Sequence, residues 1–160
     1  MKKLVIYYSL DGNTRFIAEN IARSSQADIL ELKTEIKLPT NSFGKHFVGG
    51  GMVFKRETPA LLPFDKNPTD YDMIIIGTPV WAFNFSPPIR SLLTKCKITG
   101  KKIAFFCSCG GMPGKTIPNM KELLTGNEFV GEKIFINALK NKEKTEKDAI
   151  EFVKTLSVAS

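Results

Sequence analysis

Short apolar runs alternate with helix-period segments along the whole chain, and this alternation restricts the possible folds more than any other feature. Buried strands are predicted over residues 4–8, 73–77, 103–107 and 134–138, with a weaker, alternating edge strand over 28–33. Helices are predicted over 14–23, 87–95, 118–124 and 144–156. Near-continuous apolar strands separated by helices are typical of a parallel sheet covered on both faces. We therefore expect a three-layer α/β/α sandwich with a five-stranded parallel sheet.

Length and composition agree with one globular domain spanning residues 1–160. The hydrophobic fraction is 42% and the charged fraction 24%, which are ordinary values for such a domain. The net charge of +7 is spread along the chain, which indicates a solvated basic surface rather than a binding arm. The three cysteines have no disulfide-framework spacing, so free thiols in a reducing compartment are expected. The apolar run after Lys2 and Lys3 is too short for a signal peptide, so we expect a cytoplasmic location.

The segment between residues 34 and 71 is longer than the usual connection between a strand and the next strand. A short helix is expected over 43–54, packed on the sheet or at a subunit interface, which leaves a homodimer open. The only histidine, His46, lies in this segment without a second ligand candidate nearby. A surface or capping role is expected for His46, and no metal site is predicted.

The loop from Ser9 to Thr14, between the first predicted strand and helix, has the composition of an anion-binding site. Gly12 lets the backbone approach an anion closely, and Asn13 tolerates the left-handed conformation that such loops use. A helix N-terminus adds N–H donors and a favourable dipole. The same residue types also suit an ordinary strand-to-helix turn, so this loop alone does not identify a phosphate site.

Two further loops follow predicted strands and suit a flat ligand. The loop over 77–85 holds the only tryptophan, Trp81, whose ring can stack on a flat ligand or simply pack over the core. The loop over 108–114 contains Gly110 and Gly111, which permit close approach of backbone N–H groups, although an ordinary turn has the same composition. Ligands of open α/β sheets bind beyond the carboxyl ends of the strands, where all three loops are expected to lie.

In order and spacing the three loops resemble those of the flavodoxin family: a Ser/Thr-x-Thr-Gly-x-Thr phosphate loop, a Thr-Pro-x-Trp flavin loop and a glycine-containing loop. The resemblance spans the chain and implies strand order 2-1-3-4-5, with FMN at the switch point. The uninterrupted last strand implies the short-chain form. By position, the resemblance assigns to the phosphate Ser9, Asp11, Gly12, Asn13 and Thr14. It assigns to one flavin edge Thr78, Pro79, Val80, Trp81, Ala82 and Phe83, and to the other Ser108, Cys109, Gly110 and Gly111.

The sequence departs from the family pattern in three respects. Asp11 stands where a threonine is usual, which places a carboxylate near the phosphate, and Arg15 could offset part of that charge. The third loop lacks the tyrosine that commonly covers the second flavin face, so this face is filled by Met112 or Phe85 or is open to a substrate. Flavodoxins are characteristically acidic, whereas this chain carries +7, which argues against partner recognition through acidic patches.

Three rival interpretations have less support. The segment 110–116 resembles a nucleoside-triphosphate loop, but the first glycine of that motif would fall on Cys109, and Pro113 lacks an N–H group. Cys107 and Cys109 lie on the same side of an extended strand, where packing is favoured over a thiol redox pair. Basic residues without clustered aromatic residues give little support for nucleic-acid binding.

The resemblance implies an FMN-binding flavoprotein that transfers electrons, in which the flavin supplies the chemistry and no side chain need act as acid or base. The alternative is an FMN-dependent oxidoreductase that passes hydride from NAD(P)H to a quinone or similar acceptor. A third reading is a flavodoxin-like interaction module that has lost flavin. The expected partner is a redox protein or a small-molecule electron acceptor, and neither nucleic acid nor a membrane is expected.

Overall fold

A computed structural model describes the backbone of residues 1–35 and 42–158, and the side chains of 1–35 and 48–156. Its long strands are parallel and lie in the order β2-β1-β3-β5-β6. Their bounds are Lys3–Tyr7 (β1), Asp28–Glu31 (β2), Met73–Trp81 (β3), Lys102–Cys109 (β5) and Glu128–Ile136 (β6). The predicted order of the five parallel strands is thus confirmed, since β4 (Asn84–Phe85) is an additional short strand paired antiparallel with the end of β3.

Several strand boundaries predicted from the sequence are wrong. β3 continues four residues beyond Gly77, to Trp81, because its end pairs with β4 in a hairpin. β6 begins at Glu128, earlier than the predicted start at 134, and ends at Ile136. Its first half is exposed or only half-buried, which suits an edge strand with one face only partly covered. β2 is shorter than predicted and ends at Glu31.

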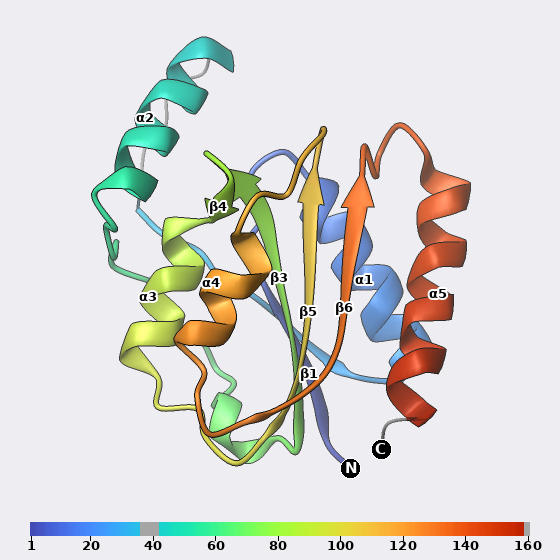
Figure 1. Cartoon of the computed structure of the whole chain (residues 1–160). Helices are drawn as coiled ribbons and strands as arrows, with labels where there is room; N and C mark the ends of the chain where they lie inside the picture. The colour runs from blue at the N-terminus through green and yellow to red at the C-terminus, as the bar shows by residue number, and fades with distance from the viewer. Residues whose placement is uncertain (36–41, 159–160) are drawn as a thin grey trace.

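Helices cover both faces of the sheet, as the alternation predicts (Figure 1). On one face lie α1 (Asn13–Ser25) and α5 (Lys142–Val158), whose apolar side chains share a cluster with alternate residues of β1, β3 and β5. On the other face lie α3 (Pro87–Lys95) and α4 (Thr116–Glu122), which pack on the remaining strand residues. A 3-10 turn (Pro68–Asp70) precedes β3. Among the described residues, no helix is long and apolar enough to cross a membrane.

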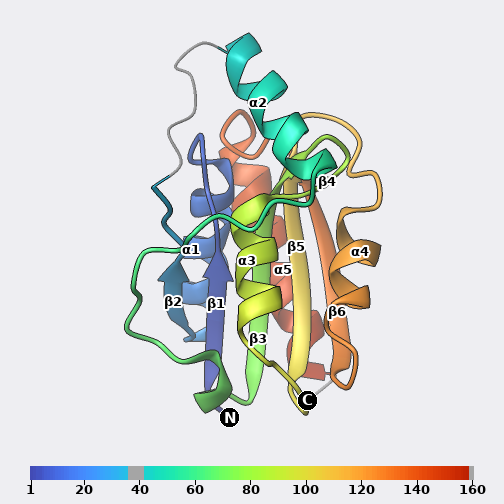
Figure 2. The same cartoon turned by 90° about the vertical axis from the view of Figure 1, so that its left-hand side faces the viewer.

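The predicted helix in the long connection is present as α2 (Ser42–Phe54). Figure 2 shows that α2 lies at the end of the sheet where β3 and β4 meet, next to the carboxyl ends of the strands. Its main packing contact with another element is with β3, and Gly49 of α2 lies against Trp81, the last residue of that strand. His46 lies on α2, outside the residues whose side chains are described. The connection therefore brings a helix to the edge of the sheet at which ligands bind in such folds.

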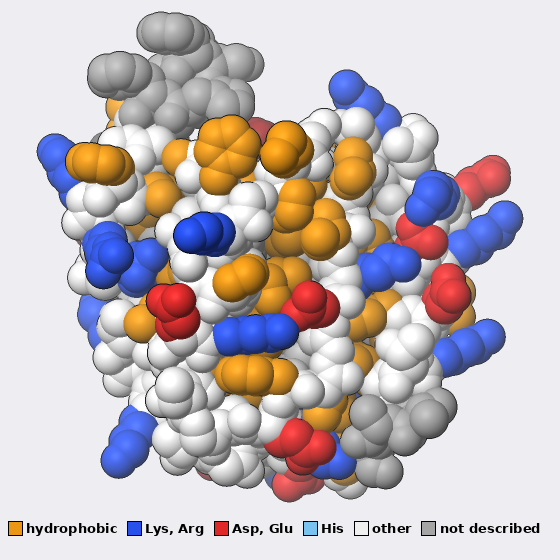
Figure 3. All heavy atoms as spheres, in the orientation of Figure 1, with side chains coloured by type: hydrophobic (Ala, Val, Ile, Leu, Met, Phe, Trp, Pro, Cys, Tyr) orange, Lys and Arg blue, Asp and Glu red, His pale blue; other side chains and the backbone are white. Residues whose placement is uncertain are grey.

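The edge strand β6 leaves apolar side chains in solvent. Ile134 and Ile136 are about half exposed, at 43% and 53%. Figure 3 shows hydrophobic side chains gathered on this face of the molecule, with Lys and Arg side chains around them. Because α4 has only seven residues, it covers part of this face and leaves the end of β6 uncovered.

Candidate functional site

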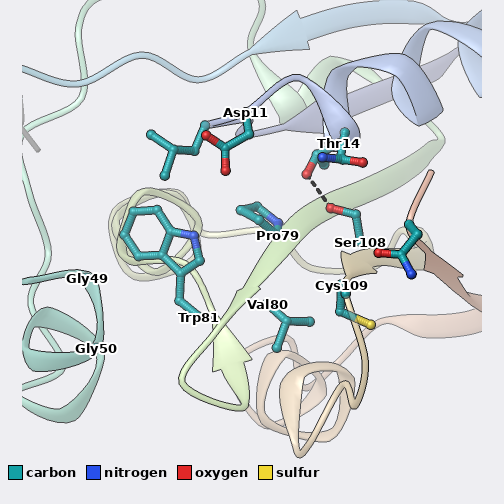
Figure 4. A pocket seen from close by; sticks show the side chains of 13 residues that line it. Asp11, Thr14, Gly49, Gly50, Pro79, Val80, Trp81, Ser108 and Cys109 are labelled. Atoms are coloured by element: carbon teal, nitrogen blue, oxygen red, sulfur yellow. Dashed lines mark hydrogen bonds between the residues drawn. The ribbon is translucent and has the colours of Figure 1, made fainter. Parts of the chain in front are cut away.

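A cavity of about 390 Å³ opens at the carboxyl ends of β1, β3 and β5. This volume is within the range of small-molecule sites. Figure 4 shows the side chains that surround it, from the loop before α1, the end of β3 and the end of β5. The lining residues are Leu10, Asp11, Asn13, Thr14, Gly49, Gly50, Pro79, Val80, Trp81, Ser108, Cys109, Gly110 and Asn137. All three loops singled out in the sequence therefore reach one cavity.

The loop before α1 has the backbone geometry of an anion-binding nest. Gly12 caps the helix in the left-handed region, with φ 87° and ψ −12°, and helical geometry begins at Asn13. The N–H groups of Asn13 and Thr14, at the first two helical positions, have no acceptor within the helix itself. Such groups, with the positive end of the helix dipole, favour a phosphate. The loop therefore fits the phosphate group of FMN.

Ser9 shapes this loop from within. Its Oγ accepts hydrogen bonds from the backbone N–H groups of Gly12 and Arg15, both at 3.2 Å. Neither Ser9 nor Gly12 is among the residues that line the cavity. The structure thus gives both residues a role in holding the loop conformation, and their direct contact with a phosphate stays a prediction.

Side chains tie the first loop to the other loops of the site. Thr14 Oγ1 and Ser108 Oγ lie 2.7 Å apart in a buried hydrogen bond that joins positions 94 residues apart. Asn13 Oδ1 accepts a hydrogen bond from the backbone N–H of Leu139 at 3.0 Å, which links the loop to the connection after β6. These hydrogen bonds fix the position of the N-terminus of α1 relative to the end of β5 and to the connection after β6.

Asp11 lines the cavity. Arg15, the basic residue nearest to Asp11 in the sequence, pairs with a different carboxylate. Arg15 forms an ion pair with Glu31, with Nη2 and Oε1 2.6 Å apart and Nε and Oε1 3.2 Å apart. Arg15 is half exposed, so this pair contributes little stability, about 0–1 kcal/mol. The cation that the sequence suggests as an offset to the charge of Asp11 is thus engaged with Glu31 in this structure.

Trp81 stands at the rim of the cavity, at the end of β3. Its indole meets the ring of Tyr8 edge-on, with centroids 5.8 Å apart and an interplanar angle of 80°. Among the described residues that line the cavity, it is the one aromatic side chain. This indole is therefore the aromatic surface that the described lining offers to a flat ligand ring, and its stacking on a flavin stays a prediction.

The hairpin that carries Trp81 turns through two strained residues. Ala82 and Phe83 both have positive φ values, 46° and 61°, which are uncommon for residues other than glycine, asparagine or aspartate. The backbone N–H of Lys115 donates to the carbonyl of Phe83 at 3.0 Å. A Cβ at Gly114 would lie 2.4 Å from the same carbonyl oxygen, so only glycine fits there. The loop after β5 thus holds the turn in place.

The remaining residues assigned from the sequence lie away from the cavity. Thr78 is buried, and its Oγ1 accepts from the backbone N–H of Ser86 at 3.0 Å, which closes the hairpin. Ala82, Phe83 and Gly111 also lie outside the lining, and Phe83 is 65% exposed. For these residues the role in cofactor binding stays a prediction.

Neither candidate for covering the second flavin face lines the cavity. Phe85 is buried in the core, where the guanidinium carbon of Arg90 lies 4.4 Å from its ring centroid. Met112 is 73% exposed and points its side chain largely into solvent. Of the alternatives that the sequence left open, Phe85 lies outside the lining because its ring packs in the core with residues of α3 and α4.

The last residue of β5 brings a thiol to the cavity. Cys109 Sγ donates to the carbonyl of Gly111 at 3.2 Å, and partial burial raises the pKa of Cys109. Burial raises the pKa of Cys107 to about 12, with smaller contributions from Cys109 and Glu132. All three cysteines are free, and Cys107 is in the core. Packing, rather than a thiol redox pair, accounts for Cys107.

Four lining residues were missed from the sequence: Leu10, Gly49, Gly50 and Asn137. Asn137 follows β6 with φ 51°, and its backbone N–H donates to the carbonyl of Cys109 at 2.9 Å. An asparagine directly after the last strand is a signal for such a left-handed position. The run Gly49-Gly50-Gly51 inside a helix was the available signal for α2, because glycine is unfavourable there without a packing reason.

Replacing Thr14 by valine is expected to lower the free energy of unfolding by about 1–2 kcal/mol, because the buried Ser108 hydroxyl loses its partner. Urea unfolding of the apoprotein measures this loss. In the double variant Thr14→Val/Ser108→Ala the loss should be smaller than the sum of the two single losses. Strictly additive losses would contradict a coupled pair.

The fold and cavity define a class: a doubly wound α/β protein with a glycine-capped helix N-terminus and an aromatic side chain beside one cavity at the switch point of the sheet. The family model for flavodoxin matches residues 2–155. The chain belongs to the flavodoxin family, which confirms the family, the flavoprotein class and the FMN cofactor class predicted from the sequence.

Solved structures share the fold. A flavoprotein of Lactobacillus acidophilus in complex with FMN is 24% identical, with a TM-score of 0.73 over 87% of this chain and 96% of that one. The oxidised flavodoxin 2 of Bacillus cereus is 19% identical, with a TM-score of 0.60 over 100% of both chains. A flavodoxin, WrbA-like protein of Agrobacterium tumefaciens is 15% identical, with a TM-score of 0.63 over 99% of both.

Proposed function

We propose that this chain binds FMN in the cavity between the loop before α1 and Trp81, and that it transfers electrons through the bound flavin. One observation carries the proposal: a helix N-terminus suited to a phosphate and an aromatic ring suited to a flavin border the same cavity. FMN, when bound, supplies the capacity to accept and donate electrons. The protein's own task is to bind, orient and partly enclose the cofactor.

One group of lining residues is suited to the phosphate of FMN, and a second group is suited to its flavin ring. Asn13 and Thr14 offer backbone N–H groups to the phosphate at the start of α1. Trp81 offers its ring to the flavin, and the end of β5 with the residue after it offers the backbone at Ser108, Cys109 and Gly110. The carboxylate of Asp11 disfavours a dianion nearby, so it is expected to reduce FMN affinity relative to a hydroxyl at that position.

The chemical character of the lining favours an electron carrier. Asp11 is the one acidic side chain among the described lining residues, and no histidine, lysine or arginine is among them. Among the described lining residues, Asp11 and Cys109 are therefore the few side chains that could carry a proton, and neither is a histidine or lysine. Electron transfer needs only position and a tuned potential, both of which stacking and backbone hydrogen bonds supply.

The alternative is an FMN-dependent oxidoreductase that takes hydride from NAD(P)H and reduces a quinone or similar acceptor. One observation favours it: among the described lining residues no aromatic side chain other than Trp81 is available to cover the second flavin face. An uncovered face would admit a nicotinamide or quinone ring. The net charge of +7 would also attract an anionic pyridine nucleotide.

A visible spectrum and an anaerobic reduction test both proposals. We expect the purified protein to be yellow, or to bind added FMN with quenching of flavin fluorescence. We then expect NAD(P)H alone to leave the flavin absorbance unchanged over many minutes, while dithionite removes it. Rapid bleaching by NAD(P)H would favour the oxidoreductase, and a colourless protein that takes up no FMN would contradict both.

The basic surface restricts the partner of an electron carrier. With a net charge of +7, association with an acidic redox protein is accelerated, and association with a basic one is slowed. We therefore propose a redox partner with an acidic contact surface, or a small-molecule electron acceptor. Electron transfer to an acidic partner should slow as ionic strength rises, whereas transfer to a neutral small molecule should be nearly independent of salt.

A further inference from the structure

Helix α2 places three successive glycines, Gly49, Gly50 and Gly51, beside the candidate site. Glycine destabilises a helix interior relative to alanine, so three in a row need a reason in the tertiary structure. The structure distinguishes the three positions clearly. Gly49 is buried, Gly50 is half-buried, and Gly51 is exposed.

Gly49 lies directly against the indole of Trp81. A Cβ built on Gly49 would lie 3.1 Å from Cε3 of the indole, 3.4 Å from Cζ3 and 3.6 Å from Cδ2. The shortest of these distances is tighter than ordinary van der Waals contact, so a methyl group would displace the ring. At Gly50 a Cβ would meet only the Cβ of Ala82, at 3.8 Å, and at Gly51 it would meet nothing within 4 Å.

Two protein elements thus hold the indole. The backbone of α2 at Gly49 lies against the six-membered ring of Trp81, and Tyr8 meets the indole edge-on at 5.8 Å. Figure 4 shows Trp81 between the α2 backbone at Gly49 and Gly50 and the cavity that Asp11, Pro79 and Ser108 border. Because α2 covers part of the indole of Trp81, the uncovered part of the indole is the part that lines the cavity.

We propose that Gly49 is a positioning residue that sets the orientation of Trp81 toward the cavity, which makes α2 part of the cofactor site. The consequence for FMN rests on the function proposed above, whereas the orientation of the indole is a property of the apoprotein. A Cβ at position 49 would lie 3.1 Å from the nearest ring atom, so the indole would have to give by a few tenths of an ångström and change its orientation toward the cavity.

The test compares Gly49→Ala with Gly51→Ala, which make the same chemical change two positions apart in one helix. Alanine raises helix propensity at both positions, so loss of the helix does not explain a difference. Trp81 is the only tryptophan, so the intrinsic fluorescence of the apoprotein reports on this ring alone. We expect Gly49→Ala to shift the emission to longer wavelength and to increase quenching by acrylamide, and Gly51→Ala to match the wild type.

FMN titration supplies a second readout. Gly49→Ala should weaken FMN binding about three- to tenfold, the range expected for a misplaced aromatic stack, and Gly51→Ala should change it less than about twofold. In a Trp81→Phe background the smaller ring has room to move, so Gly49→Ala should then change affinity less than about twofold. This double-variant cycle separates an effect through the indole from a general disturbance of α2.

The outcomes distinguish this proposal from the proposed function. Identical fluorescence and quenching in Gly49→Ala, Gly51→Ala and wild type would overturn the positioning role. An unreduced effect of Gly49→Ala on FMN affinity in the Trp81→Phe background would overturn it as well. If wild type binds no FMN but Gly49→Ala alone alters the fluorescence, the positioning of Trp81 stands and the cofactor proposal fails.

Discussion

Replacing Gly77 by alanine is expected to lower the free energy of unfolding by about 3 kcal/mol, the upper part of the usual range for overpacking a core. Gly77 pairs with Phe106 on the neighbouring strand β5. A Cβ on Gly77 would lie 2.0 Å from Cζ and 2.5 Å from Cε1 of that ring, which is impossible without movement.

The ring of Phe106 has little room to move away. Phe106 is fully buried and packs edge-on against Phe135, with centroids 6.2 Å apart. The added methyl group must therefore shift the ring, its neighbour on β6, or the backbone of β3. Because β3 continues to Trp81, a backbone shift at Gly77 also reaches the site.

Urea unfolding followed by far-UV circular dichroism measures this effect. Gly51→Ala is the control, because a Cβ there meets nothing within 4 Å, and it should be neutral or slightly stabilising. Adding Phe106→Leu to Gly77→Ala should recover part of the loss relative to the sum of the single changes, since the smaller side chain vacates space. A loss below about 1 kcal/mol would mean that the core at this point is less closely packed than described.

Replacing Trp81 by alanine is expected to weaken FMN binding by at least about tenfold, or about 1.4 kcal/mol. The change removes both the stacking partner and the apolar area that the indole contributes to the cavity wall. No other aromatic side chain among the described lining residues is available to replace it. Trp81→Phe should retain most of the affinity, because a smaller ring still stacks.

Flavin-fluorescence quenching measures this affinity, with Phe54→Ala as the control. Phe54 is an aromatic residue at the end of α2 that is 90% exposed and does not line the cavity, so its loss should leave FMN affinity unchanged. An unchanged affinity in Trp81→Ala would refute the stacking role. Because Trp81 also packs on Tyr8, a melting curve of each apoprotein should accompany the titration to detect a loss of stability.

The loop before α1 contains features that the sequence predicts and others that it does not. Gly12 and the start of α1 were predictable, because a strand, a short polar loop and an amphipathic helix follow one another locally. The roles of Ser9 and Thr14 were not, because a hydroxyl can serve a ligand or another protein group equally well. Thr14 pairs with Ser108, and Ser9 accepts from the backbone of its own loop.

The second loop shows a different limit. The sequence identified Trp81 as the stacking residue but treated its neighbours from 78 to 83 as one flavin-binding strip. In the structure this strip is the end of a strand followed by a tight turn, and of its residues Pro79, Val80 and Trp81 line the cavity while the others have different surroundings. Thr78 enters the core, and Phe83 reaches solvent.

By itself, the sequence determined the order of strands and helices, the parallel sheet and the three loops at its carboxyl edge. These features follow from periodicities of two and 3.6 residues and from glycine-rich turns, which are properties of short segments. Only the tertiary structure decided that α2 reaches the cavity and that Gly49 lies against Trp81. Contacts between residues so distant in sequence depend on how packed elements fill space, and no local pattern in the chain encodes that.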